Sequence, residues 1–424
     1  MNPIRFILRD DTSIQSWEPF ALTRPVGELV FGTLSLRRRA ERRLGLSCEG
    51  YLLKEGAGRE HLARTSVSGS PPVTTHLPPD PERPTLVLSA RVALDAVAGG
   101  SDALEGMLAG DEPGTLTLNG VECGWFAPAG KGVSDSRGAA PTLELAGTLL
   151  VNLWDLVASN SARLWADLEP RGRETPDSEA TVPHVIGDHP VRIAPGANVE
   201  PGVVIDARSG AVTVGYGAKI ETPARLEGPV ALGPGVSVSA FTRLVGPVFV
   251  GAGSRVLGGE IAASRVGRHS RVRGEVAYSI VGDFANKAHE GHVAHSIIGD
   301  WVNLGAGTII SNLKNNYAPI RVRGASGSRK TDLVKLGALI GDYARTGIGT
   351  LIGTGSIIGA GSNIFGGGMA SGFIPPFSWT DGTRSRYRVD DFVESLGRMM
   401  ARRGQEMTPA LESRVRRVWE ASVP

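Results

Sequence analysis

Residues 192–256 have the sequence RIAPGANVEPGVVIDARSGAVTVGYGAKIETPARLEGPVALGPGVSVSAFTRLVGPVFVGAGSRV, in which aliphatic residues recur at every sixth position, with one slip of three residues between Ile205 and Val214. An amphipathic helix cannot carry this pattern, because its apolar stripe needs steps of three and four residues. Simple strand alternation does not fit either, since a glycine or proline interrupts nearly every unit. The period therefore indicates short strands separated by turns, with three strands closing one triangular coil.

The same phase continues through most of the second half of the chain. In a stack of such coils, each phased side chain points to the axis and packs on the aliphatic residue about 18 positions later. Glycine suits the corners, where φ is positive or another backbone approaches closely. A glycine-rich disordered linker is the alternative, and the long phased series argues against it. The phased residues are Ile193, Val199, Ile205, Val214, Ile220, Leu226, Leu232, Val238, Leu244, Val250, Val256, Val266, Val272, Ile298, Leu304, Ile310, Ile340, Ile352, Ile358 and Ile364.

This hexapeptide pattern resembles that of left-handed parallel β-helices, and the left-handed sense comes from that resemblance, because the period alone does not give it. We expect the β-helix over residues 185–380. The phase is lost within 311–339, where we expect a loop or a short β-excursion that leaves the helix, as insertions of this kind often carry function. The basic residues of this insertion are Arg321, Arg323, Arg329 and Lys330.

Composition limits the class of protein. The 424 residues are 41% hydrophobic and 21% charged, with a formal net charge of +2. This balance excludes nucleic-acid binding by bulk charge, and no apolar run approaches the ~18–20 residues that cross a bilayer. The start, MNPIRFILRDD, is charged too early for a signal peptide. With Cys48 and Cys123 alone, a disulfide framework or a four-thiolate zinc site is ruled out. We expect a soluble cytoplasmic protein with neither membrane nor nucleic-acid partners.

Three histidines, His289, His292 and His295, follow one another at a spacing of three. Three interpretations are open. Imidazoles could bind zinc between subunits, but no nearby cysteine or paired carboxylate completes a ligand set, and we expect no bound metal here. The histidines could instead be structural residues at corners. The third interpretation, a catalytic histidine, agrees with a family resemblance of the surrounding sequence.

The stretch resembles the acetyltransferase half of the bifunctional uridyltransferase/acetyltransferase family that makes UDP-N-acetylglucosamine. In that family, a SKAGH-type sequence is followed nine residues later by IGDNVNIGAGTITCNYDG. Here NKAH, ending at His289, is followed at the same distance by IGDWVNLGAGTIISNLKN. The resemblance implies that His289 is the general base, that Asn303 contacts the amine and that Asn312 lies beside the acetyl group.

The chain departs from this family pattern at two tyrosines, which are replaced by His292 and Leu313. We expect His292, and Lys287 of the NKAH motif, to contribute to substrate binding. The resemblance also implies acetyl-CoA as the acyl donor and a homotrimer whose clefts lie between subunits.

The chemistry of acetyl transfer agrees with this assignment. Transfer from a thioester to a sugar amine needs a base with a pKa near 7, which favours imidazole. It also needs donors for the developing oxyanion, which amide side chains or the backbone N–H groups of Gly305, Gly307 and Thr308 could supply. The thioester is already electrophilic, so neither a metal nor a covalent enzyme intermediate is required.

In residues 1–168, predicted strands, among them one buried strand over 85–94, alternate with predicted helices, which indicates a doubly wound, Rossmann-like α/β sheet. The segments 22–41 and 335–379 resemble a divergent branch of the same bifunctional family, described as sugar nucleotidyltransferases with a hexapeptide domain. The arginines in 37–43 are expected on the exposed face of a helix. A linker over 169–184 and a helical tail over 381–424 complete the predicted organisation.

The glycine-rich phosphate loop of ordinary sugar nucleotidyltransferases is missing from this chain. Its place is taken by LRDDTSIQSWEPFALTRP, in which Arg9 and Arg24 are candidates for nucleotide binding. Mg²⁺ is a candidate cofactor that Asp10, Asp11 or Asp155 could coordinate, although each of these aspartates also suits a cap or loop. Two functions are therefore open for the first domain. It either transfers a nucleotide to a sugar phosphate with a divergent loop, or it has lost catalysis and serves binding or assembly. In the second case, the β-helix would serve to oligomerise the chain or to sense a ligand.

Overall fold

The computed structural model describes residues 4–64, 70–78, 80–132, 138, 140–169, 184–380 and 384–422. The chain forms two compact units. One unit contains 1–17, 21–153 and 395–424, and the other contains 18–20 and 154–394. The predicted linker lies almost wholly outside the described residues.

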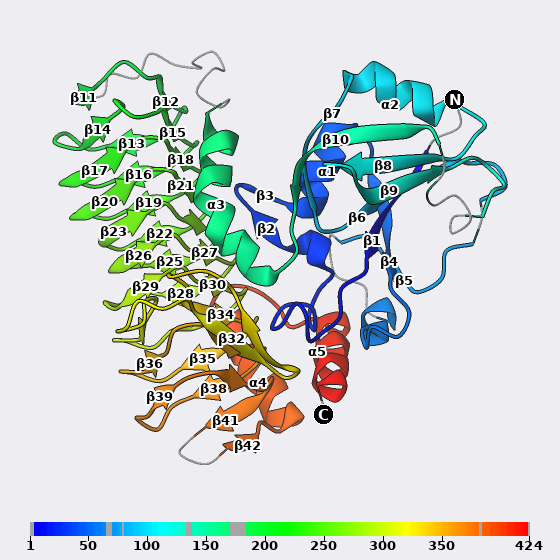
Figure 1. Cartoon of the computed structure of the whole chain (residues 1–424). Helices are drawn as coiled ribbons and strands as arrows, with labels where there is room; N and C mark the ends of the chain where they lie inside the picture. The colour runs from blue at the N-terminus through cyan, green and yellow to red at the C-terminus, as the bar shows by residue number, and fades with distance from the viewer. Residues whose placement is uncertain are drawn as a thin grey trace. The chain divides into compact units, whose positions relative to one another are not determined.

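The first unit is built on an eight-stranded mixed sheet (Figure 1). Its parallel half has the order β5-β4-β1-β6, and β9 continues the sheet antiparallel to β6. The α/β class is confirmed, but the sheet is mixed, and the segment predicted as one strand over 85–94 forms two. The strands are β1 (Arg5–Asp10), β4 (Cys48–Leu53), β5 (Val73–Thr74), β6 (Thr85–Ser89), β7 (Val92–Val97), β8 (Gly114–Leu118), β9 (Val121–Ala127) and β10 (Thr142–Leu149), with β2 (Val30–Phe31) and β3 (Leu34–Ser35) pairing separately.

Helix α1 (Leu36–Leu44) shows how local sequence sets an element of this unit. Ser35 caps its start, Gly45 ends it at φ 68°, and Leu36 and Leu44 are buried one above the other. The remaining helical segments of the unit before residue 153 are η1 (Val26–Glu28), η2 (Glu60–Arg64) and α2 (Gly100–Leu108).

The expectation that the arginines of 37–43 lie on an exposed face is wrong for Arg37 and Arg39, which are buried. Arg37 Nε donates to Glu28 Oε1 at 2.7 Å, and Arg39 Nη2 donates to the Phe31 carbonyl at 2.9 Å. Both guanidinium groups thus donate hydrogen bonds inside the unit, which composition alone does not reveal.

The second unit is the predicted left-handed parallel β-helix, whose three faces are parallel sheets (Figure 1). The first face has β11 (Val185–Ile186), β14 (Val204–Asp206), β17 (Ala224–Glu227), β20 (Thr242–Val245), β23 (Gly259–Ala262), β26 (Glu275–Ala277) and β29 (His292–Ala294), followed by β31 (Ile309–Ile310), β36 (Leu351–Ile352) and β39 (Met369–Ala370). The second has β12 (Val191–Ile193), β15 (Val212–Val214), β18 (Val230–Leu232), β21 (Val248–Val250), β24 (Arg265–Val266), β27 (Ile280–Val281), β30 (Ile297–Ile298), β34 (Ala338–Ile340), β37 (Ser356–Ile358) and β40 (Phe373–Ile374). The third has β13 (Asn198–Val199), β16 (Lys219–Ile220), β19 (Ser237–Val238), β22 (Arg255–Val256), β25 (Arg271–Val272) and β28 (Asn286–Lys287), then β35 (Arg345–Thr346), β38 (Asn363–Ile364) and β41 (Ser378–Thr380). The last strand, β42 (Arg384–Arg386), pairs antiparallel with β41.

The predicted axial stacking is confirmed. Val214, Leu232 and Val250 pair in register at the predicted spacing of 18 residues, and all are buried. Coils further along are shorter, as where Val266 pairs with Val281. The phased aliphatic side chains form one continuous core along the axis.

Several corners carry positive φ without glycine, which the sequence analysis did not anticipate. His269, Phe284 and Trp301 adopt φ between 53° and 60° on successive coils, and their rings stack with centroids 5.0 and 4.3 Å apart. Tyr278 and His295 do the same at another corner, with centroids 4.9 Å apart. Ring stacking between coils thus offsets part of the cost of the left-handed backbone.

The interruption at 311–339 contains a β-hairpin, which confirms the predicted β-excursion. Strands β32 (Arg321–Gly324) and β33 (Gly327–Lys330) pair antiparallel. Ile320 and Val322 have 0% exposure on the inner side of the hairpin, so it is packed against the β-helix.

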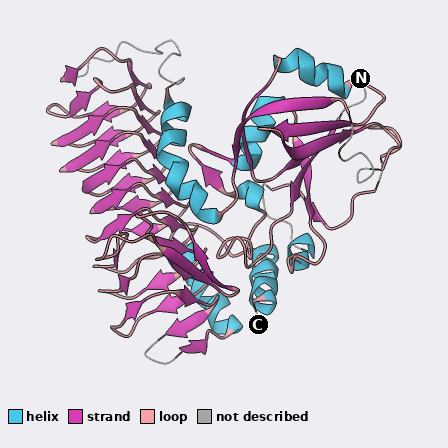
Figure 2. Cartoon of the chain, viewed as in Figure 1, coloured by secondary structure: helices cyan, strands magenta, loops and turns pink. Residues whose placement is uncertain are grey.

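Three further helices are α3 (Leu153–Leu168), α4 (Val389–Ala401) and α5 (Pro409–Ala421), drawn in cyan with the others in Figure 2. The short C-terminal helices are as expected. The compact units differ from the predicted ranges, because most of α3 clusters with the β-helix and α5 clusters with the sheet unit. No helix in the described residues is long and apolar enough to cross a membrane.

Candidate functional site

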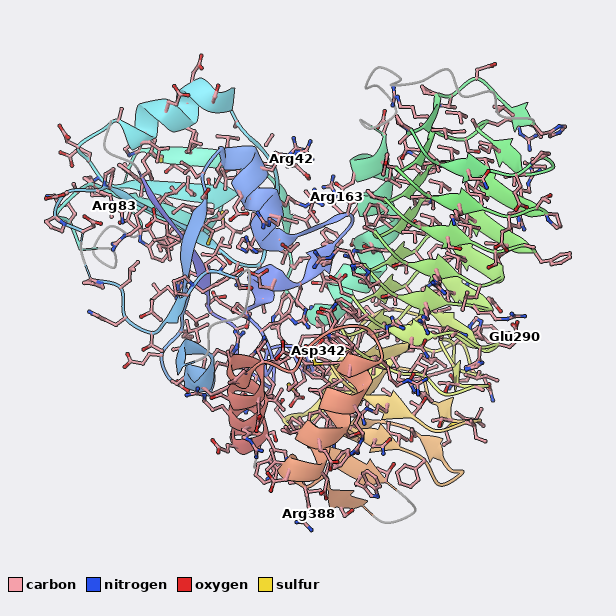
Figure 3. All side chains as sticks on the ribbon, turned by 180° about the vertical axis from the view of Figure 1, so that it is seen from behind. Arg42, Arg83, Arg163, Glu290, Asp342 and Arg388 are labelled. Carbon is pink, nitrogen blue, oxygen red and sulfur yellow. The ribbon has the colours of Figure 1, made fainter. Side chains whose placement is uncertain are left out.

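The NKAH motif occupies one corner of the β-helix. His289 and Glu290 lie between β28 and β29 with exposed side chains, and Figure 3 labels Glu290 at the outer edge of the coils. Within the described residues, the His289 ring has no hydrogen-bond or ion-pair partner. Its imidazole is therefore accessible to a bound molecule.

Backbone contacts hold this corner in place. A Cβ at Gly291, where φ is 138°, would lie 2.2 Å from the Thr308 carbonyl oxygen, so the next coil approaches too closely for any side chain. Lys287 Nζ donates to the carbonyls of Arg273 at 2.7 Å and His289 at 2.6 Å. Burial lowers the pKa of Lys287 to about 8. The ammonium group thus fastens the backbone beside His289.

Asn303 and Asn312 lie on the coil that follows His289. Asn303 forms a parallel bridge with Asn286, whose Nδ2 donates to Asn303 Oδ1 at 2.8 Å. This register puts position 306 beneath His289 and Asn312 beneath His295. The three residues predicted from the resemblance are on adjacent coils, with Asn303 beneath Asn286 and Asn312 beneath His295, so neither asparagine lies directly beneath His289.

His292 and His295 have different surroundings. His292 Nδ1 lies 3.0 Å from Glu275 Oε1 of the preceding coil, on an exposed part of the face. His295 Nδ1 lies 2.9 Å from Asn312 Nδ2, an arrangement in which the ring accepts a hydrogen bond from the amide. Burial first, then nearby Lys335 and His292, lower the pKa of His295 to about 4, so this imidazole is neutral near pH 7. Sequence spacing did not single out this His295–Asn312 pair.

On one face of the β-helix, the outward-pointing side chains change from polar to apolar after this coil. Its outward column runs in register from Glu275 to His292, and then includes Ile309, Leu351 and Met369. These last three side chains are 43%, 42% and 62% exposed. We call Ile309, Leu351 and Met369 the apolar column; it begins directly below His292, on the same face.

In the sheet unit, Arg9 lies near the carboxyl end of β1, where ligands bind in open α/β sheets. Its guanidinium carbon is 5.6 Å from the Trp125 ring centroid, and Nη1 is 4.0 Å from Asp11 Oδ2. Arg91 donates from Nε and Nη2 to both Asp11 oxygens, at 3.0 and 3.2 Å. Arg24 is half-buried, and its carbonyl accepts a hydrogen bond from Arg59. Arg91 thus adds a second cation beside Arg9 that the site prediction did not include.

Asp10 and Arg59 form an ion pair that sequence analysis missed. Arg59 Nη1 lies 2.8 Å from Asp10 Oδ1, and both side chains have 0% exposure. Asp10 Oδ2 accepts from the Val26 N–H at 2.7 Å, while Arg59 Nε donates to the Ala21 carbonyl at 2.9 Å. The pair therefore fixes the segment that replaces a glycine-rich loop. A charged residue directly after an apolar strand was the available signal, but its partner is 49 positions away.

Two of the three aspartates considered for Mg²⁺, Asp10 and Asp11, are engaged by arginine, and the third, Asp155, lies in the first turn of α3. Asp10 is held by Arg59 and Asp11 by Arg91, so an ion would have to displace a guanidinium group to bind either carboxylate. Among the described residues, no group of three histidine, cysteine or acidic side chains is arranged to hold a metal. These residues as arranged do not fit a magnesium site.

Comparison with known families gives one match. Residues 6–174 match the family model described as sugar nucleotidyl transferase, a range that includes α3 and all of the mixed sheet except Arg5 of β1. No curated protein matches the chain. The matched range ends before β11, the first strand of the β-helix. The match supports a sugar nucleotidyltransferase domain in the N-terminal part of this chain, and thus a transferase of sugar metabolism acting on small sugar phosphates and nucleotides.

Proposed function

We propose that the chain is a two-activity transferase of UDP-N-acetylglucosamine-type nucleotide-sugar biosynthesis. The β-helix transfers an acetyl group from acetyl-CoA to an amino-sugar phosphate, and the sheet domain transfers a nucleotide to the product. The observation that carries the acetyltransferase assignment is the exposed, unengaged imidazole of His289, on a coil adjacent to Asn303 and Asn312.

The reaction proposed for this imidazole is a direct acyl transfer. The sugar amine attacks the thioester carbonyl, forming a C–N bond, while the imidazole of His289 accepts the proton that the nitrogen loses. The tetrahedral intermediate then breaks its C–S bond, and the departing thiolate takes up that proton. The three backbone N–H groups expected to stabilise the oxyanion are engaged within the fold: Gly305 N–H donates to the Thr346 carbonyl at 3.1 Å, Gly307 N–H to the Glu290 carbonyl at 3.2 Å, and Thr308 N–H to the Gly305 carbonyl at 3.1 Å. Amide side chains are therefore the better candidates for oxyanion stabilisation.

The positions of His289 and Asn312 favour a site shared between two copies of the chain. Six positions separate His289 from His295, which lies above Asn312. At ~3.3 Å per residue the backbone between these positions spans at most about 20 Å, and the two side chains start from different corners of the coil. The apolar column on the same face supports a homotrimer, because exposed apolar surface next to a site is typical of subunit interfaces.

Replacement of His289 tests the acetyltransferase. We expect His289→Ala to lower acetyl-CoA turnover with amino-sugar phosphates at least a hundredfold, with the oligomeric state unchanged. His269→Ala is the matched control, since His269 is also an exposed corner histidine but stacks on Phe284. Full activity of His289→Ala would exclude His289 as the base.

A second candidate function is a nucleotidyltransferase-like domain that has lost catalysis and serves binding or assembly. It is favoured by the loop after β1, which lacks glycines and is fixed by the buried Asp10–Arg59 pair. Incubating the protein with sugar 1-phosphates, nucleoside triphosphates and Mg²⁺ and measuring pyrophosphate distinguishes the two. Release of pyrophosphate that Arg9→Ala abolishes supports the active domain, and no release with any nucleotide supports the second candidate.

A further inference from the structure

A groove of about 540 Å³ lies on the β-helix unit beside the inserted hairpin. It is lined by Arg323, Gly324, Gly327 and Ser328 of the hairpin and by Ser371, Gly372 and Phe373 at the turn into β40. Volumes of roughly 300–1,000 Å³ are typical of sites for small molecules. Neither the family match nor the predicted acetyl-transfer residues include this groove.

The hairpin wall of the groove is firmly supported. Val322 lies between Arg321 and Arg323 with its side chain fully buried, so the two arginines point outward. The β-helix also leaves room for the hairpin at Gly355, where a Cβ would lie 2.6 Å from Ile320 Cγ2. A rigid wall means that a ligand need not order this segment on binding.

Arg323 is the cation of the groove that is available to a ligand. Within the described residues, its exposed guanidinium has no hydrogen-bond or ion-pair partner. By contrast, Arg321 donates to Ser328 Oγ at 2.9 Å, and Arg329 lies over the Trp154 ring at 4.8 Å. The acidic group facing the hairpin tip is Glu18, whose buried carboxylate accepts a hydrogen bond from Ala325 N–H at 3.1 Å.

The rest of the lining suits a phosphate and a flat ring. Three of the lining residues are glycines, with φ of 114° at Gly327 and 73° at Gly372, so backbone groups can approach a ligand without a side chain between them. The Arg323 side chain crosses Gly372, where a Cβ would lie 3.7 Å from Arg323 Cδ. A half-buried ring, Phe373, lies at the same groove and offers a surface on which a base can stack.

We propose that this groove binds a phosphorylated nucleoside, with a phosphate on Arg323 and the base against Phe373. A guanidinium group binds phosphate through paired charge-assisted hydrogen bonds. The nucleoside end of coenzyme A and a nucleotide or nucleotide sugar share this chemistry. The identification of coenzyme A as the source rests on the proposed function, whereas the groove itself does not.

Calorimetric titration of the full chain with adenosine 3′,5′-bisphosphate tests the site. We expect saturable binding that Arg323→Ala weakens about tenfold or more. Lys330→Ala is the matched control, because Lys330 is an exposed cation of the same hairpin outside the groove, and we expect less than a threefold change. Phe373→Leu should reduce the preference for the bisphosphate over pyrophosphate. Absence of binding, or equal losses in the two cation variants, would overturn the proposal.

Competition identifies the source of the nucleoside. Displacement of the bisphosphate by coenzyme A and not by UDP-N-acetylglucosamine assigns the groove to an acyl donor, and the reverse assigns it to a nucleotide sugar. If the bisphosphate binds in a manner that depends on Arg323 but the protein transfers no acetyl group, the proposed function is contradicted and the groove assignment stands. If the protein transfers acetyl groups but does not bind the bisphosphate in this way, the groove assignment is contradicted and the proposed function stands.

Discussion

At the scale of single residues, Asp10 and Arg59 carry opposite charges where water does not reach them, since both side chains are fully buried. Removing two charges from water is costly, and the pair is tolerated because its remaining polar atoms are also bonded. Asp10 accepts from Thr12 and Val26, and Arg59 donates to the Ala21 and Arg24 carbonyls. The pair therefore determines the path of the chain after β1.

Replacement of Asp10 tests this role. We expect Asp10→Asn to lower the free energy of unfolding by about 3–5 kcal/mol, because the Arg59 charge then stays buried without a counter-ion. Urea unfolding followed by circular dichroism measures the change. Arg38→Ala is the control: its ion pair with Glu41 is 3.4 Å long and the Arg38 side chain is 62% exposed, so about 0.5 kcal/mol or less is expected. Equal losses of unfolding free energy in the two variants would mean that the buried pair stabilises the fold no more than the exposed pair does.

His295 makes stability depend on pH. Its folded-state pKa of about 4 lies below the ordinary value of 6.5, so between these pH values the unfolded chain binds more protons. Its contribution to stability is full above pH 6.5 and is lost as the pH falls towards 4. We expect the stability difference between the wild type and His295→Asn to shrink from pH 7.5 to pH 5. A difference that stays constant would contradict the assigned pKa, which NMR titration of the ring measures directly.

At the scale of elements, the β-helix depends on contacts between neighbouring coils. Leu244 is fully buried between Leu226 and Ile261, which pair with it on either side. Because each coil contacts only its neighbours, a defect is felt mainly by adjacent coils.

We expect Leu244→Ala to cost about 2–5 kcal/mol, through lost burial and the cavity left behind. Hydrogen exchange should accelerate most in the strands that contain Leu226, Leu244 and Ile261. Ile348→Ala is a suitable control, since Ile348 is 85% exposed and its truncation opens no cavity. Exchange that rises uniformly along the whole β-helix would show that the coils unfold as one unit instead.

Most elements of the β-helix could be predicted, because a local rule of six residues is repeated in the sequence. The features of the β-helix that the sequence analysis did not predict depend on contacts between coils. The left-handed backbone at His269, Phe284 and Trp301 is supported by ring stacking across coils, which no local pattern shows. The segment predicted as one strand likewise forms two, because β6 pairs with β1 and β7 pairs with β10.

At the scale of the whole molecule, we propose that two copies of the chain share the acetyl-transfer site. His289 and Asn312 lie at different corners of one face, and the apolar column occupies the strands that follow on that face. In such an arrangement, His289 of one copy would meet Asn312 of another across this face.

Mixing two inactive variants tests this arrangement. Neither His289→Ala nor Asn312→Ala should be active alone, but after unfolding and refolding together about one quarter of the interfaces would combine an intact His289 with an intact Asn312. We therefore expect acetyl-CoA turnover to recover to a comparable fraction of the wild-type value. Refolding each variant separately before mixing is the control. No recovery, in a mixture shown by mass to contain hybrid oligomers, would place both residues in the same copy.

The sequence by itself determined the β-helix, the α/β class of the first domain and the spacing of His289, Asn303 and Asn312, because each depends on residues that are close along the chain. Only the tertiary structure decided that Asp10 pairs with Arg59, that Asn312 bonds to His295 and that Arg323 lines a groove with Phe373. Such partners lie 17 to 50 positions apart, and their register follows from coil lengths and strand order that no local pattern specifies.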